Sequence, residues 1–110
     1  MSIDRKAAVS AWKERKSAPG IYAIRCTVSG ERWLGQAPDM ATVQNRHWFA
    51  LRMGSHTNRA LQAAWTLHGA DALVLEVVEL LAEENDPVLR DSRLRNALRR
   101  WRDETGAAAV

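Results

Sequence analysis

The feature that most constrains the fold is a nearly continuous apolar run, ALVLEVVELL, at residues 72–81. It is too short to span a bilayer, and Glu76 and Glu79 interrupt it. Its length and β-branched content predict a strand, and its apolar character on both faces predicts a central position in a sheet. The two glutamates, three positions apart, are expected on opposite faces of that strand.

A β-hairpin is expected upstream, with strands at residues 20–28 and 32–37. If Ser29-Gly30 forms a two-residue turn, Cys26 lies opposite Trp33. Side chains alternate along a strand, so Trp33 then shares a face with Tyr22, whereas a three-residue turn would separate them. The sequence therefore predicts two large aromatic side chains on one face of the hairpin, provided that the turn has two residues.

Helical spacing of apolar residues predicts four helices, at residues 3–16, 40–53, 58–68 and 87–104. Asp39 and Asp86 stand where N-caps are expected, and Pro87 suits a first helical position. The expected fold is α+β, with a small three-stranded antiparallel sheet flanked by helices in the order α-β-β-α-α-β-α. We expect one domain over residues 1–110: an extra N-terminal helix within 1–17, a core over 19–104 and a loose tail at 106–110.

Composition narrows the class of protein. A hydrophobic fraction of 46% in 110 residues fits one folded domain. The single cysteine excludes an internal disulfide and a cysteine-rich zinc site. A net charge of +3 permits contacts with nucleic-acid phosphates without requiring them. The N-terminus lacks the apolar segment of a signal peptide, so we expect a cytoplasmic protein with no membrane partner.

Two short motifs and their surroundings resemble a known family. Gly20-Ile21-Tyr22 precedes the hairpin turn and Trp33-Leu34-Gly35 follows it. The stretch GSHTNRALQAAWTLHG at residues 54–69 then carries a Gly, a His, an Asn, Leu-Gln, an aromatic and a Gly in order. The series resembles the GIY-YIG nuclease superfamily over residues 19–101, as a divergent member with WLG in place of YIG.

The resemblance implies an endonuclease that hydrolyses nucleic-acid phosphodiester bonds with one divalent metal ion, Mg²⁺ or Mn²⁺. It gives Tyr22 the role of activating or positioning a water. Trp33 stands in place of the second tyrosine, and its indole N–H donates a hydrogen bond but cannot exchange a proton. We carry both over as candidate catalytic residues.

Further site residues follow from the resemblance. The arginine that stabilises phosphate charge is assigned to Arg46, one helical turn beyond the ungapped position. His56, in a loop before a helix, is a candidate for proton transfer. Asp91 is the candidate metal ligand early in the last helix, with Glu76 and Glu79 as alternatives. His47 is interpreted as a packed, hydrogen-bonded residue on the apolar side of its helix.

Nucleic acid is the expected partner, with DNA favoured over RNA, and a homodimer is left open. Candidate phosphate contacts are Arg25 and Arg32 on the hairpin and Arg95 and Arg99 on the last helix. A catalytically degenerate module that binds nucleic acid or protein is the alternative function. A third interpretation, an unrelated interaction domain, expects Tyr22 and Arg46 to lie far apart.

Overall fold

The computed structural model describes residues 18–110, and the helix predicted at residues 3–16 lies outside them. Its elements are β1 (Gly20–Cys26), β2 (Arg32–Ala37), α2 (Met40–Arg52), α3 (Arg59–His68), a 3₁₀ turn η1 (Ala70–Ala72), β3 (Leu73–Leu80), α4 (Pro87–Thr105) and β4 (Ala108–Ala109). The strands form one mixed sheet in the order β3-β1-β2-β4. The predicted α+β class is confirmed, but the three-stranded antiparallel sheet is corrected to four strands, because β4 pairs in parallel with β2.

The central position predicted for the apolar run at residues 72–81 is wrong. That run forms β3, which in the described part of the chain pairs only with β1. β1 pairs on both sides and is buried at nearly every position, whereas most of β3 is half-buried. A continuous apolar run thus indicates that both faces of a strand are covered. It does not determine whether the strand lies at the centre or at the edge of the sheet.

The hairpin has a four-residue connection instead of the predicted two-residue turn. Cys26 closes the loop with Glu31 through a backbone hydrogen bond of 2.9 Å, and Trp33 lies opposite Ile24 rather than Cys26. The register therefore differs from the expected one by two residues. Because a shift of two preserves the alternation of side chains, Tyr22 and Trp33 still share a face, as predicted.

A β-bulge changes the orientation of the two glutamates on β3. The register between β1 and β3 shifts at Ile21/Tyr22, so that Ala23 pairs with Glu76 and Ile21 pairs with Glu79. Both glutamates therefore lie on the same face of the sheet, because the extra residue of a bulge reverses the alternation. The prediction that they occupy opposite faces is corrected.

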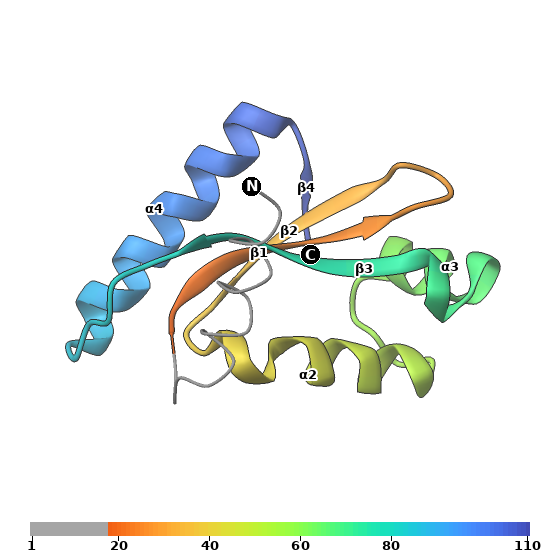
Figure 1. Cartoon of the computed structure of the whole chain (residues 1–110), viewed down its shortest axis with the longest axis horizontal. Coiled ribbons are helices and arrows are strands. Elements are labelled where there is room, and N and C mark those ends of the chain that lie inside the picture. Colours follow the sequence, from red (N-terminus) through yellow and green to blue (C-terminus); the bar gives the residue numbers. More distant parts are fainter. Residues whose placement is uncertain (1–17) are drawn as a thin grey trace, which may run out of the picture.

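Helices cover both faces of the sheet (Figure 1). α2 and α3 lie on one side, over a core that contains Tyr22, Ile24 and Trp33. α4 lies on the other side, where Leu94 and Ala97 pack against Ile21. β1 is thus covered on both faces, which is why six of its seven residues are buried.

Side-chain caps fix where the helices begin. Asp39 Oδ1 accepts from the N–H of Ala41 at 2.9 Å, and Asp86 Oδ1 accepts from the N–H of Val88 at 2.9 Å. Asn58 caps α3 by accepting from the N–H of Leu61 at 3.1 Å. Among residues 18–110, none of the helices has the length and apolar character needed to cross a membrane.

The C-terminal segment, which we expected to be loose, forms β4 beside β2. The N–H of Val110 donates to the carbonyl of Leu34 at 2.9 Å. The side-chain amide of Asn58 donates to the carbonyl of Ala109 at 3.1 Å. The three alanines at residues 107–109 show no pattern that predicts a strand. β4 forms because the edge of β2 is available for pairing.

Candidate active site

Tyr22 lies in the middle of β1, directly across from Gly35 of β2. A Cβ atom at Gly35 would lie 2.5 Å from both Cζ and Oη of Tyr22, so the phenol ring occupies the space that a side chain would fill. The residue is only 3% exposed, and its hydroxyl reaches a cavity beside the sheet. The glycine of the second motif therefore sets the position of the tyrosine of the first.

Two histidines extend from that hydroxyl in a chain of hydrogen bonds. His47, on α2, places Nε2 2.5 Å from Tyr22 Oη. The other ring nitrogen of His47, Nδ1, lies 2.8 Å from Nε2 of His56, in the loop between α2 and α3. Nδ1 of His56 in turn accepts from the backbone N–H of Asn58 at 3.0 Å. All four imidazole nitrogens are thus engaged.

The backbone N–H at the end of this chain determines where the protons lie. Because the N–H of Asn58 can only donate, Nδ1 of His56 is the acceptor, and a neutral His56 carries its hydrogen on Nε2. That N–H donates to Nδ1 of His47, which places the hydrogen of a neutral His47 on Nε2. His47 therefore donates to the oxygen of Tyr22, and the phenol's own hydrogen is directed elsewhere.

The electrostatic environment keeps all three rings neutral near pH 7. Burial is the main cause that lowers the pKa of His47 to about 4, helped by the charges of His56 and Arg46. Burial also lowers the pKa of His56. Burial raises the pKa of Tyr22 to about 12, and the charge and hydrogen bond of Arg46 oppose that rise.

The cavity at Tyr22 has a volume of about 410 Å³. Arg46, His47 and His56 line it, and Val110 of the C-terminal segment forms part of its wall. Arg46 is exposed and lies next to His47 on α2, so its cationic end is available at the cavity. The arrangement brings together a phenol, a guanidinium and two neutral imidazoles. It also contradicts the unrelated-domain interpretation, which expects Tyr22 and Arg46 to lie far apart.

Of the residues predicted for the site from the sequence, the structure brings Tyr22, Arg46 and His56 to one cavity. Trp33 does not line it: its side chain is 3% exposed and belongs to the core beneath α2 and α3. Asp91 is exposed on α4 and is not among the residues that line the cavity.

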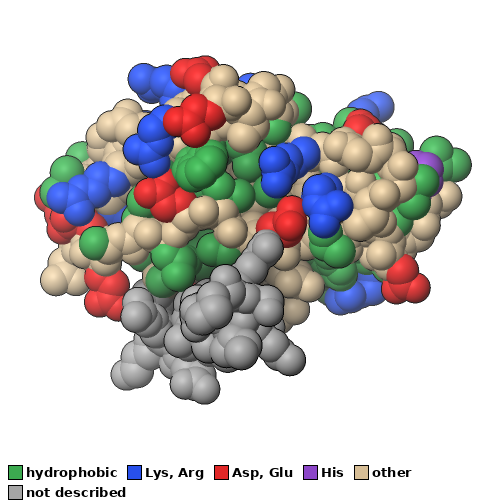
Figure 2. Space-filling view, turned by 45° about the horizontal axis from the view of Figure 1, so that its top comes forward, with side chains coloured by type: hydrophobic (Ala, Val, Ile, Leu, Met, Phe, Trp, Pro, Cys, Tyr) green, Lys and Arg blue, Asp and Glu red, His purple; other side chains and the backbone are tan. Residues whose placement is uncertain are grey.

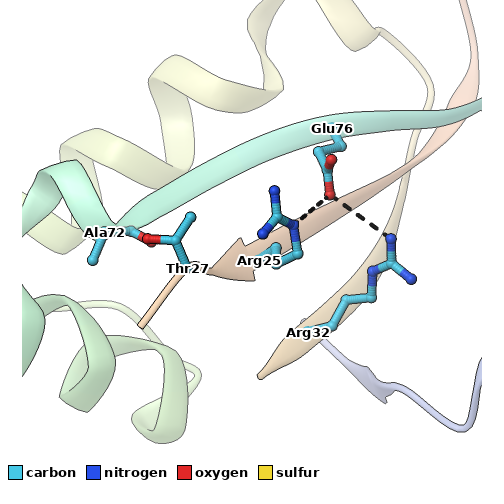
Figure 3. Close-up of polar contacts among 5 residues, drawn as sticks. All are labelled: Arg25, Thr27, Arg32, Ala72 and Glu76. Carbon is cyan, nitrogen blue, oxygen red and sulfur yellow. Dashed lines mark hydrogen bonds and ion pairs between the residues drawn. The ribbon is translucent and has the colours of Figure 1, made fainter. Parts of the chain in front are cut away.

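The arginines expected to contact nucleic acid divide into two groups. Arg25 Nε lies 3.1 Å from Glu76 Oε1, and Arg32 lies 3.8 Å from the same oxygen (Figure 3). Both arginines thus form ion pairs with the same carboxylate on β3. Arg95 and Arg99 instead line a second cavity along α4.

His47 is the contributor that sequence reasoning missed. Its place on the inner side of α2 suggested a packed, hydrogen-bonded residue with no part in the site, and its imidazole does pack against the ring of Tyr22 with a centroid separation of 5.4 Å. The available signal was the polar run Asn45-Arg46-His47 one residue ahead of Trp48. Only the fold could show that Arg46 and His47 line the cavity at the tyrosine.

The residues around the cavity do not fit a divalent metal ion. Mg²⁺ and Mn²⁺ prefer carboxylate oxygens, and no aspartate or glutamate is among the lining residues. Within residues 18–110 there is no cluster of three or more His, Cys, Asp or Glu side chains able to hold a metal. The ring nitrogens of His47 and His56 are occupied by hydrogen bonds to one another, to Tyr22 and to Asn58.

Comparisons with known proteins bear on the fold. No protein-family model matches the chain, and no curated protein sequence matches it significantly. The chain is similar to a solved structure of the catalytic domain of the intron endonuclease I-TevI, a point mutant, with a TM-score of 0.69 and 24% identity over 81% of this chain and 84% of that one. A second structure, of the catalytic domain of homing endonuclease I-TevI, gives a TM-score of 0.67 and 24% identity over 80% and 88%. I-TevI is a GIY-YIG homing endonuclease, so the resemblance expected from the motifs is confirmed at the level of the fold.

Proposed function

From the fold of a GIY-YIG endonuclease catalytic domain, we propose that this chain hydrolyses phosphodiester bonds of nucleic acid at the cavity around Tyr22. The observation that carries the proposal is the position of the Tyr22 hydroxyl. It ends a chain of hydrogen bonds that begins at a backbone N–H, and it opens on a cavity that Arg46 also lines. A hydroxyl held in this way has one orientation of its hydrogen and can exchange it with a bound molecule.

In the proposed reaction the ionised phenol is the general base. The phenolate of Tyr22 is stabilised by the N–H of His47 and by Arg46, so it exists as a small fraction at neutral pH despite the raised pKa. It takes a proton from a water whose oxygen attacks phosphorus. The bond from phosphorus to the leaving oxygen breaks with its electron pair, and solvent supplies the proton to that oxygen.

Arg46 supports the same step by electrostatics. The attack adds negative charge to the phosphoryl oxygens, and a guanidinium at the cavity offsets it through charge-assisted hydrogen bonds. His47 and His56 act as positioning residues, because His47 holds the oxygen of Tyr22 and His56 holds His47. DNA remains our favoured substrate over RNA, by analogy with a homing endonuclease.

The resemblance implies Mg²⁺ or Mn²⁺, which would supply Lewis-acid stabilisation of the phosphate when bound. Because the described side chains give no carboxylate to the cavity, we derive no step through a metal and do not assign Asp91 as its ligand. The same observation favours a second candidate function, a module that binds nucleic acid without cutting it. Trp33 adds to it, since the second-motif position is part of the core.

Cleavage of single- and double-stranded DNA and RNA, with and without added Mg²⁺ or Mn²⁺, tests the proposal. Arg46→Gln is expected to lower the cleavage rate about 10²- to 10³-fold, as for the loss of one preorganised donor. Arg52→Gln, an exposed arginine at the end of the same helix that does not line the cavity, is the matched control and is expected to cut normally. Binding without any cleavage would leave the second candidate in place of the first.

A further inference from the structure

A second cavity, of about 460 Å³, lies along α4. Arg95, Arg99 and Arg102 line it, one helical turn after another on the same helix. The cavity adjoins the candidate active site, because Gln36 and Leu98 line both. The two cavities therefore form one path from Tyr22 to the arginines of α4.

The charges in this second cavity favour an anion. Arg95 and Arg99 are exposed, and neither forms an ion pair with a carboxylate in residues 18–110. Arg102 is held in place by a hydrogen bond from its Nε to the carbonyl of Ala107 at 3.4 Å. Asp103 is the one acidic residue among those that line it. Three guanidiniums against one carboxylate leave a net positive charge.

Four other arginines of the described chain, Arg25, Arg32, Arg93 and Arg100, form ion pairs with glutamates. Arg25 and Arg32 share Glu76 on the sheet (Figure 3), and Arg100 of α4 lies 2.6 Å from Glu79. Charged side chains of both signs are intermixed on the face that Figure 2 presents. Net positive charge alone therefore does not mark a binding surface on this protein. Arg95 and Arg99 differ from these paired arginines because they line a cavity and have no carboxylate partner within residues 18–110.

We propose that this cavity binds a backbone phosphate of the nucleic-acid substrate that flanks the phosphate at Tyr22. The inference rests on the proposed function and adds the path of the substrate: from the hydroxyl of Tyr22, past Gln36 and Leu98, to Arg95 and Arg99. Guanidinium groups bind phosphate oxygens in pairs of parallel hydrogen bonds. Contacts of this kind fix the position of the strand without reading its sequence.

Binding by the full chain in a Tyr22→Phe background separates this inference from catalysis. We expect Arg95→Gln/Arg99→Gln to weaken binding of a DNA duplex at least tenfold. The slope of log affinity against log salt is expected to fall by about 1, for the one phosphate that the two arginines no longer neutralise. Arg100→Gln, on the same helix but paired with Glu79, is the matched control and is expected to bind normally. Asp103→Asn is expected to tighten binding, because it removes the opposing charge.

Substrates with one neutral methylphosphonate locate the contact. A methylphosphonate beside the scissile position is expected to weaken binding by the Tyr22→Phe protein and to have no effect on the variant that also lacks Arg95 and Arg99. Equal binding by the two proteins, together with cleavage by wild type, would overturn the inference and leave the proposed function intact. Weakened binding without cleavage by wild type would support the cavity and reject the nuclease. Absence of any binding would reject both.

Discussion

Nε2 of His47 lies 2.5 Å from Oη of Tyr22, and the hydrogen bond runs from the imidazole to the phenol. The direction follows from the backbone N–H of Asn58, which fixes the tautomer of His56 and through it that of His47. The phenol is therefore an acceptor toward the protein and keeps its own hydrogen for the cavity. This relationship gives the site its chemistry and yields predictions on rate, stability and pH.

The first prediction concerns the pH dependence of the rate. Since the base is the phenolate of a tyrosine whose pKa is raised to about 12, its fraction grows in proportion to hydroxide across the neutral range. Single-turnover cleavage is expected to rise roughly tenfold per pH unit between pH 7 and 10. A rate that levels off near pH 7 would instead assign the proton transfer to a group with an ordinary histidine pKa.

The second prediction concerns Gly35. In Gly35→Ala the added methyl group would collide with Tyr22, which costs roughly 1–3 kcal/mol of folding free energy and displaces the hydroxyl from His47. Urea unfolding and cleavage measured together are expected to show losses of both stability and activity. Gly20→Ala is the control, since its Cβ would lie 2.6 Å from the carbonyl oxygen of Glu79 and away from the hydroxyl. If Gly20→Ala lost as much activity at equal stability, the contact between Gly35 and Tyr22 would have no special role.

The third prediction concerns His47 and the stability of the fold. The pKa of His47 is about 4 in the folded protein against 6.5 for an unperturbed histidine, so below pH 6.5 the unfolded chain takes up the proton first. The free energy of unfolding is thus expected to fall as the pH falls from 6.5 to 4, and to be unaffected by this group above 6.5. His47→Asn should flatten that part of the profile and also slow cleavage, because Tyr22 loses its donor.

His68→Asn is the matched control for this variant. His68 lies at the end of α3 and is not among the residues lining the cavity, so its substitution is expected to leave cleavage unchanged. An unchanged stability profile in His47→Asn would show that burial does not hold this imidazole neutral.

Much of the fold was predictable from the sequence because its signals are local. Asp39 and Asp86 cap the helices where they were expected, and β2 and α4 begin at the predicted residues. What could not be predicted depends on distant parts of the chain. The bulge beside Ile21 reverses part of β3, and β4 forms only because β2 offers an edge. Neither the bulge nor β4 can be recognised from the residues that form it.

The same distinction between local and long-range signals applies to the residues of the candidate site. Tyr22 carried a recognisable motif, and Arg46 and His56 followed from order along the chain. The hydrogen bond between His47 and Tyr22 joins residues 25 positions apart and required the packing of α2 on the sheet. Trp33 shows the opposite case, since its motif position suggested a site whereas its side chain is enclosed by the core. Motif letters therefore specify a strand position and not the environment of the side chain.

Single-turnover cleavage by wild type and Tyr22→Phe is the most direct test of the central claim. Phenylalanine keeps the ring over Gly35 and removes only the hydroxyl, so the fold is expected to persist, as circular dichroism and urea unfolding can verify. We predict that wild type cuts nucleic acid and that Tyr22→Phe cuts about 10²- to 10⁴-fold more slowly, the usual contribution of a general base. Equal cleavage rates in the two proteins would contradict the assignment of Tyr22 as the group that takes the proton from water.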